Sequence, residues 1–129
     1  MEIRLIVAGG RDFTNKQVLT AALDTIIPEL FETTGLDRLR IISGNARGTD
    51  KCGEDYAIDN SIPLFMFPAD WNMYGKRAGY IRNVKMAEFA KADGNIGALV
   101  AFWDGKSKGT KHMINIARER GLTVYVFSY

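Results

Sequence analysis

Three stretches of the sequence place glycines beside hydroxyl and cationic side chains. They read GGRDF at 9–13, SGNARGTD at 43–50 and DGKSKGT at 104–110. Glycines let the backbone approach a ligand closely, and the free N–H groups at a helix start favour phosphate. Arginine adds a planar fork of donors that suits bidentate phosphate binding. The stretches therefore predict an anion-binding site, with hydroxyl donors from Ser43, Thr49, Ser107 and Thr110 and positive charge from Arg11, Arg47 and Lys108.

The combination of the three stretches carries this prediction, because each one alone is typical of a tight turn between a strand and a helix. The familiar phosphate-binding fingerprints are absent from the sequence. No GxGxxG follows the first apolar run, and GxxxxGK[ST] does not occur anywhere. An ordinary dinucleotide-dependent dehydrogenase and a P-loop enzyme are therefore disfavoured.

A fourth stretch, PADWNMYGKRAGYIRN at 68–83, mixes aromatic and basic residues. Aromatic rings stack on nucleic-acid bases, and arginine holds phosphate. The alternative is that Trp71 only covers an edge of the sheet and that Arg77 lies on a solvated helix face. We predict that Asn83 either orients Arg82 or binds a ligand hydroxyl. The residues predicted to contact a base or a ribose are Asp70, Trp71, Lys76, Arg82 and Asn83.

The acidic residues of these stretches have several possible uses. Asp12, Asp50, Asp70 and Asp104 all fall in them, and their carboxylates suit ribose hydroxyls, a magnesium ion, or the capping of helices and turns. The chain has one cysteine and one histidine, His112, which we expect on a helix surface, and no spacing that suits a transition metal. We therefore expect no resident metal and no required cofactor, with Mg²⁺ only alongside a phosphate-bearing ligand.

The apolar pattern places these stretches on an α/β fold. Runs at 3–8, 39–43, 62–67, 97–102 and 123–127 suit buried parallel strands, and the segments 15–33, 48–60, 76–91 and 110–120 have helical spacing. For the first helix we predict Thr14 as N-cap and a kink or break near Ile27, because Pro28 lies inside it. Right-handed crossovers then give a Rossmann-like, three-layer domain whose five-stranded parallel sheet has helices on both faces and the strand order 3-2-1-4-5.

This order brings the three glycine stretches together at the carboxyl ends of neighbouring strands, beside the crevice between strands 1 and 4. Open α/β sheets bind ligands at this crevice. The connection from 68 to about 76 is long for a compact domain, which is typical of a binding loop. The pattern therefore places one ligand site at one edge of the sheet.

Length and charge restrict the function further. The chain has 129 residues, which suits one domain spanning 1–129, and an apolar share of 47% that is typical of globular proteins. A net charge of +2 is too small to favour a DNA-wrapping or membrane-surface protein. We see no export leader, and the longest apolar run, 96–103, is far shorter than the ~18 residues of a membrane helix. We therefore expect a cytoplasmic monomer or homodimer, in the host cytoplasm if its source is viral.

These motifs, in this order from residue 3 to about 121, resemble the YspA/YpsA-related branch of the SLOG superfamily. The resemblance implies a Rossmann-like domain that senses or processes nucleotides or nucleotide-derived, ADP-ribose-like ligands. The ligand contacts that it implies are Gly9, Gly10, Arg11, Ser43, Gly44, Arg47, Gly48, Gly109 and Thr110, with Trp71, Lys76 and Arg82 beside them.

The same superfamily contains LONELY GUY-type phosphoribohydrolases, whose signature resembles PGGxGTxxE with a catalytic glutamate. Here the GT is present at Gly109 and Thr110, but Met113 stands where the glutamate would be. A thioether is neither an acid nor a base. The same hydrolytic mechanism is therefore disfavoured, and the sequence leaves enzymatic activity open.

Three functions follow, in order of preference. The first is a module that binds or senses a nucleotide-type small molecule. The second is a hydrolase of an N-glycosidic or phosphate bond, in which Asp12, Asp50 or Asp104 takes over as catalytic base. The third is single-stranded nucleic-acid binding through the aromatic and basic residues of 68–83, which the small net charge disfavours.

Overall fold

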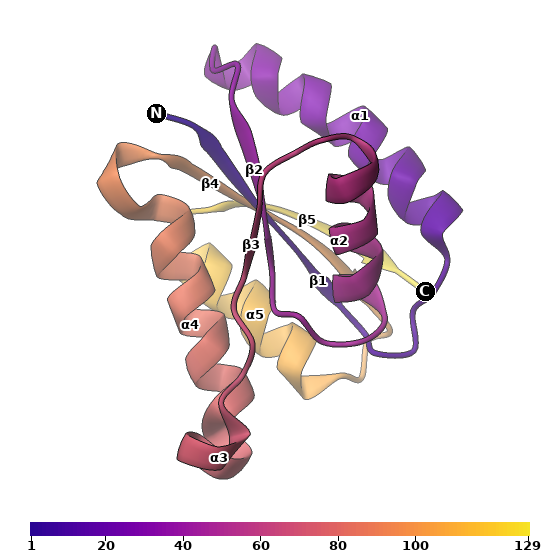
Figure 1. The fold of residues 1–129 in the computed structure, drawn as a ribbon, viewed down its shortest axis with the longest axis vertical. Helices are drawn as coiled ribbons and strands as arrows, with labels where there is room; N and C mark the ends of the chain where they lie inside the picture. Colours follow the sequence, from indigo (N-terminus) through magenta and orange to yellow (C-terminus); the bar gives the residue numbers. More distant parts are fainter.

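A five-stranded, all-parallel sheet forms the centre of the molecule, with the strand order β3-β2-β1-β4-β5 (Figure 1). This confirms the predicted Rossmann-like α/β fold and strand order. The computed structural model describes residues 1–129. The strands are β1 (Ile3–Gly9), β2 (Leu39–Ser43), β3 (Leu64–Met66), β4 (Ile96–Trp103) and β5 (Thr123–Ser128). The helices are α1 (Lys16–Thr34), α2 (Thr49–Asp59), α3 (Trp71–Tyr74), α4 (Ala78–Lys91) and α5 (Lys108–Glu119), with short 3₁₀ turns at Gly75–Arg77 and Ala92–Gly94.

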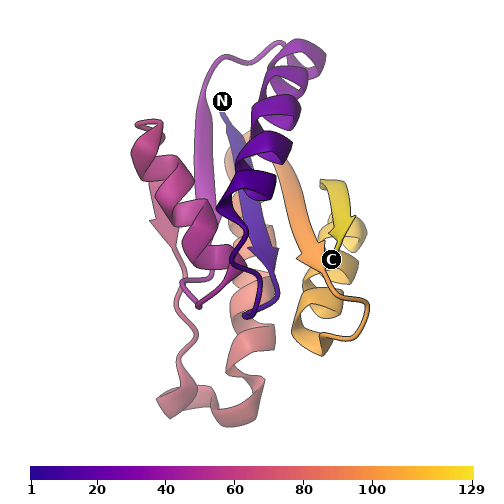
Figure 2. The same cartoon turned by 90° about the vertical axis from the view of Figure 1, so that its right-hand side faces the viewer.

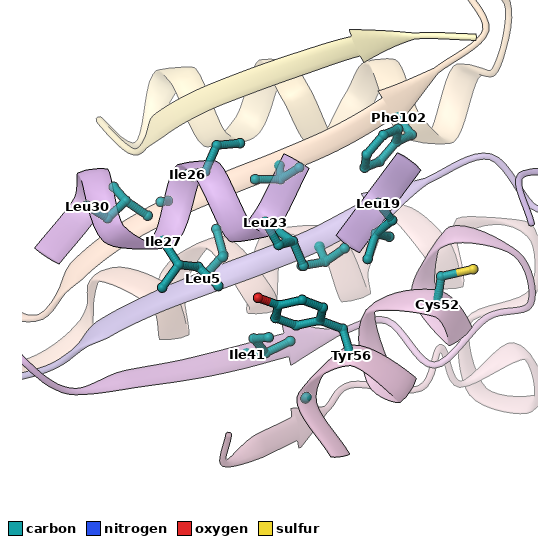
Figure 3. Close-up of a cluster of buried hydrophobic side chains, with 14 of the residues drawn as sticks. Leu5, Leu19, Leu23, Ile26, Ile27, Leu30, Ile41, Cys52, Tyr56 and Phe102 are labelled. Atoms are coloured by element: carbon teal, nitrogen blue, oxygen red, sulfur yellow. The ribbon is translucent and has the colours of Figure 1, made fainter. Parts of the chain in front are cut away.

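Alternate side chains of the central strands fill two separate hydrophobic cores, one on each face of the sheet. Leu5 and Val7 of β1 point to the face covered by α1 and α2, whereas Ile6 and Ala8 point to the face covered by α4 and α5. Because both faces are covered, these strands are apolar without interruption. Figure 3 shows the first core, where Leu19 and Leu23 of α1 lie over the strands beside Tyr56 of α2.

Helix α1 differs from the prediction at its start and at its proline. Its N-cap is Asn15, whose side chain accepts a hydrogen bond from the Val18 amide, so the helix begins one residue later than Thr14 would allow. The break expected near Ile27 does not occur, since one helix runs on to Thr34. Pro28 lies on the solvent side, where water can satisfy the carbonyl that loses its partner, while Ile27 is buried on the sheet.

The connection that the sequence predicted as a binding loop contains the short helix α3 and a 3₁₀ turn. Both ribbon views place α3 at the far end of the molecule from the start of β1 (Figures 1 and 2). The Asp70 side chain accepts a hydrogen bond from the Met73 amide at 3.0 Å and so caps this helix. None of the helices combines the length and the apolar character that crossing a bilayer requires.

Candidate functional site

A cleft of about 520 Å³ opens at the carboxyl ends of β1, β2 and β4. Its size falls within the range of small-molecule sites, and it includes the predicted crevice between β1 and β4. Residues from all three glycine stretches and from the start of α4 meet there. The lining consists of Ala8, Gly9, Gly10, Arg11, Asp12, Ala46, Arg47, Asp50, Trp71, Lys76, Gly79, Tyr80, Arg82, Asn83, Met86, Asp104, Ser107, Gly109, Thr110 and Met113.

Arg82 is a half-buried cation whose orientation is fixed by two acceptors. Its Nη1 donates to the Gly44 carbonyl oxygen at 2.6 Å, and its Nε donates to Asn83 Oδ1 at 3.0 Å. The Nη2 group has no partner within the protein. Burial lowers the pKa of Arg82 from its usual value, although the charge of Asp50 opposes this effect. The guanidinium, which stays charged at neutral pH, therefore presents pre-oriented donors to an anion in the cleft.

Asn83 connects this arginine to helix α5. Its Oδ1 accepts from Arg82, while its Nδ2 lies 3.2 Å from both the Gly109 carbonyl oxygen and His112 Nδ1. The side chain is buried and uses both of its polar ends inside the protein. Asn83 therefore holds Arg82 and the start of α5 in a fixed relation.

Asp50 is the most deeply buried acid of the cleft, with an exposed fraction of 6%. Its Oδ2 accepts the Ala46 amide at 3.1 Å, and no group of the protein hydrogen-bonds to its Oδ1. Burial raises the pKa of Asp50 to about 6, against the opposing effects of the Ala46 hydrogen bond and of Arg82. At neutral pH the cleft therefore contains a buried carboxylate with one oxygen free for a donor.

The other two cleft acids each accept hydrogen bonds from the protein through one oxygen. Asp12 accepts the phenol hydrogen of Tyr129. Asp104 accepts the backbone amides of Ser107 and Lys106, both at 2.8 Å, and these hydrogen bonds lower its pKa. Both residues use only Oδ1 in these hydrogen bonds and are exposed, so Asp50 differs from them in its burial.

Trp71 and Arg11 stand at the exposed rim of the cleft. The Trp71 side chain is 50% exposed, and the Arg11 guanidinium lies 5.9 Å from the centre of its ring system. Lys76 lines the same side. An exposed indole with a cation nearby provides a surface on which a planar base can stack.

Six of the residues predicted to hold phosphate line the cleft, and four do not. Those that line it are Gly9, Gly10, Arg11, Arg47, Gly109 and Thr110. The Ser43 hydroxyl instead donates to Glu54 Oε2 at 2.7 Å, and the Thr49 hydroxyl donates to the Gly10 carbonyl oxygen at 3.0 Å. Both side chains are fully buried. The remaining two, Gly44 and Gly48, lie behind the cleft surface.

Gly48 has a φ of +78°, and a Cβ there would come within 2.5 Å of the backbone of Arg11. Its role is therefore to let the 43–50 stretch pack against the 9–13 stretch. Of the residues predicted to contact a base or a ribose, Trp71, Lys76, Arg82 and Asn83 line the cleft, whereas Asp70 caps α3 outside it.

The sequence did not predict that Tyr80 and Met86 line the cleft. Tyr80 also packs on His112 with the ring centres 4.5 Å apart, and burial lowers the pKa of His112. The expectation of a simple surface histidine is therefore wrong in part, since its ring is half-buried between α4 and α5. The signal available in advance was the spacing of Tyr80, Asn83 and Met86, which places them on one face of a helix.

Met113, the residue in the position of the phosphoribohydrolase glutamate, lines the cleft and is 1% exposed. Its place confirms that an apolar thioether occupies that part of the wall. No three His, Cys, Asp or Glu side chains gather closely enough to hold a metal ion. The charged side chains that line the cleft are the cations Arg11, Arg47, Lys76 and Arg82 and the acids Asp12, Asp50 and Asp104.

Comparisons with known proteins identify relatives of the chain. The model of the YspA, cpYpsA-related SLOG family (YAcAr) matches residues 3–74, which include the first two glycine stretches and α3. The Gene 61 protein of Mycobacterium phage D29 is 30% identical over 129 aligned residues, which cover 96% of this chain and 95% of the phage protein. No solved structure gives a significant match.

Proposed function

The chain belongs to the YspA, cpYpsA-related SLOG family, and we propose that it binds or senses a nucleotide or a nucleotide-derived, ADP-ribose-like ligand in this cleft. Membership of this family suggests a nucleotide-related Rossmann-like domain. The lining chemistry supports a ligand that is anionic at one end and planar at the other. Such a ligand matches a base joined through a sugar to phosphate.

The observation that carries the proposal is the pairing of Arg82 with Trp71 across one cleft. Arg82 is locked by the Gly44 carbonyl and by Asn83 and keeps Nη2 free, so phosphate oxygens meet donors that are already oriented. Trp71 offers an exposed ring at the rim, where a base can stack without losing contact with the cleft.

The start of α5 adds a second set of donors for phosphate. Gly109 and Thr110 line the cleft at the first turn of this helix, and a Cβ on Gly109 would meet no atom within 4 Å. The open space beside Gly109 lets a ligand approach the backbone amides of the first turn. Arg47 adds a further positive charge to the cleft lining.

Thermal-shift measurements against AMP, ADP, ATP, GTP, NAD, ADP-ribose and cyclic variants test the proposal, each with and without Mg²⁺. A ligand at a hundred times its Kd stabilises by about 2.7 kcal/mol, which raises Tm by several degrees for a domain of this size. We expect such a shift with at least one member of the panel. No shift with any member would refute the proposal and direct attention to nucleic acid or a protein partner.

Arg82→Gln and Arg77→Gln form a matched pair of variants. Both remove one positive charge from neighbouring turns, but Arg77 does not line the cleft. We expect Arg82→Gln to weaken the affinity by about 10-fold or more, because a charge-assisted pair to phosphate is lost. Arg77→Gln is expected to leave the affinity within about 2-fold of the wild-type value, because a charge outside the binding contact has little effect on affinity. Equal effects of the two variants would place the anion elsewhere.

Hydrolysis of an N-glycosidic or phosphate bond is the second candidate function, and Asp50 favours it. A carboxyl group with a pKa of about 6 and one free oxygen in a cleft has the properties of a general base near neutral pH. Chromatography of the protein–nucleotide mixtures distinguishes the two functions. An intact ligand supports binding or sensing, whereas a released base or phosphate that Asp50→Asn abolishes supports the hydrolase.

A further inference from the structure

We propose that Asp50 accepts a hydrogen bond from a hydroxyl group of the ligand's sugar, so that the cleft prefers ribose-bearing nucleotides to their deoxyribose counterparts. This inference rests on the proposed function, because it identifies the class of nucleotide that the same cleft selects.

The hydrogen bonding of Asp50 leaves one of its oxygens available to a ligand. The Ala46 amide occupies Oδ2, while Oδ1 has no donor, although the residue is more than nine-tenths buried. Oδ1 is not one of the buried side-chain atoms that lack a hydrogen-bond partner, so it is accessible from the cleft although the rest of the residue is buried. The side chain lines the cleft, so the missing donor can come from a bound molecule.

Two positive charges of the cleft act on Asp50. The guanidinium of Arg82 lies on the deep side and that of Arg11 at the rim, and both charges act on the Asp50 carboxylate. A direct ion pair forms with neither of them. Asp50 therefore lines the same cleft as the group assigned to phosphate and the group beside the stacking indole, and it is paired with neither.

A neutral hydroxyl group suits the Asp50 carboxylate better than the other parts of a nucleotide do. A phosphate oxygen against Asp50 would meet a like charge, which electrostatic repulsion disfavours. A sugar carries neutral hydroxyl groups, each of which donates one hydrogen bond to a carboxylate. The base is assigned to Trp71 at the exposed rim, away from the buried carboxylate. Hydroxyl groups of the sugar are therefore the donors that suit this position.

The experiment compares the affinities of ADP and GDP with those of their 2′-deoxy and 3′-deoxy counterparts by calorimetry. Loss of a hydrogen bond to a charged acceptor predicts an affinity decrease of about 10-fold or more for at least one of the two deoxy positions. In Asp50→Asn this ratio is expected to fall below about 3-fold, because the charged acceptor is gone. Asp50→Ser serves as a second variant that removes the carboxylate and keeps a small polar group.

Asp70→Asn is the matched control, since Asp70 caps α3 outside the cleft and asparagine caps equally well. Its ribose preference should equal that of the wild type. Equal affinities for ribose and both deoxyribose forms in the wild type would overturn the inference and leave the proposed function standing. A preference that survives in both Asp50 variants would also overturn it. If ADP, GDP and every other nucleotide tested fail to bind, the proposed function fails, and this inference fails with it.

Discussion

Replacing Asp50 with asparagine should make the ligand-free protein more stable at neutral pH. The pKa of this carboxyl group rises from 3.8 in the unfolded chain to about 6 in the folded protein because the group is buried. Between pH 3.8 and about 6 the folded state therefore holds a proton that the unfolded state releases. The stabilising contribution of this proton is complete below pH 3.8 and is lost as the pH rises through about 6.

The size of the effect follows from the shift of the pKa. A shift of about two pKa units lowers the free energy of unfolding by about 3 kcal/mol at neutral pH. About 2 kcal/mol of this loss develops between roughly pH 4 and roughly pH 7.5. The asparagine side chain stays neutral and keeps an acceptor for the Ala46 amide. Asp50→Asn should therefore equal the wild type in stability near pH 4 and exceed it by about 2 kcal/mol near pH 7.5.

Urea unfolding at the two pH values measures this difference. The two proteins differ at this one side chain, so the change of the difference with pH reports mainly on the titration of Asp50. Asp70→Asn provides the control, because it makes the same chemical change at an exposed side chain outside the cleft. An Asp50→Asn protein that is less stable than wild type near pH 7.5, or a difference that is independent of pH, would refute the argument that burial of this charge dominates.

Three other changes probe the cleft. Gly9→Ala should destabilise the protein by about 1–3 kcal/mol in denaturant unfolding, because its Cβ would lie 2.3 Å from the carbonyl oxygen of Phe102 on the neighbouring strand. Gly109→Ala adds a Cβ that meets no atom, so it should raise stability by up to about 1 kcal/mol and weaken nucleotide binding. Unchanged binding would show that no ligand approaches this turn. Arg47→Ala should weaken binding about several-fold in calorimetry with little change in Tm. Trp71 fluorescence should change when a nucleotide binds but stay constant when an oligonucleotide is added, and a salt-sensitive response to the oligonucleotide would favour nucleic-acid binding instead.

The strands and their order could be predicted because their pattern is determined locally. Runs such as 3–8 and 97–102 are apolar without interruption, as a strand covered on both faces requires, and the alternation with helices leaves few topologies. The position of the cleft followed from that topology alone. The effect of Pro28 did not follow from the topology. It depends on whether the missing backbone hydrogen bond falls on the solvent side of α1.

The hydrogen-bond partner of each polar side chain near the cleft was harder to predict than its location near the cleft. Thr49 and Asp50 are adjacent at the start of α2, yet the first is fixed by the Gly10 carbonyl, 39 residues away in the sequence, and the second faces the cleft. The Ser43 hydroxyl is unavailable to a ligand because it donates to Glu54, a residue outside the three glycine stretches. Such assignments depend on partners from distant segments, so residue type and loop position predict only the set from which ligand contacts are drawn.

Arg82 and Asp50 carry opposite charges on the floor of one cleft, and they do not form an ion pair. Each is held instead by a backbone group of the 44–48 segment, Arg82 by the Gly44 carbonyl and Asp50 by the Ala46 amide. A direct pair would neutralise both charges and leave neither available to a ligand, as in the Lys16–Asp55 bridge on the surface. A Cβ at Gly44 would lie 2.4 Å from Arg82 Nη1 and 2.8 Å from Asp50 Oδ2, so this glycine allows the backbone to stand between them. Burying the Asp50 carboxylate without an ion-pair partner lowers the stability of the protein, but it keeps a donor and an acceptor separately available to a ligand in one cleft. A pair with a purely structural role would not need this separation.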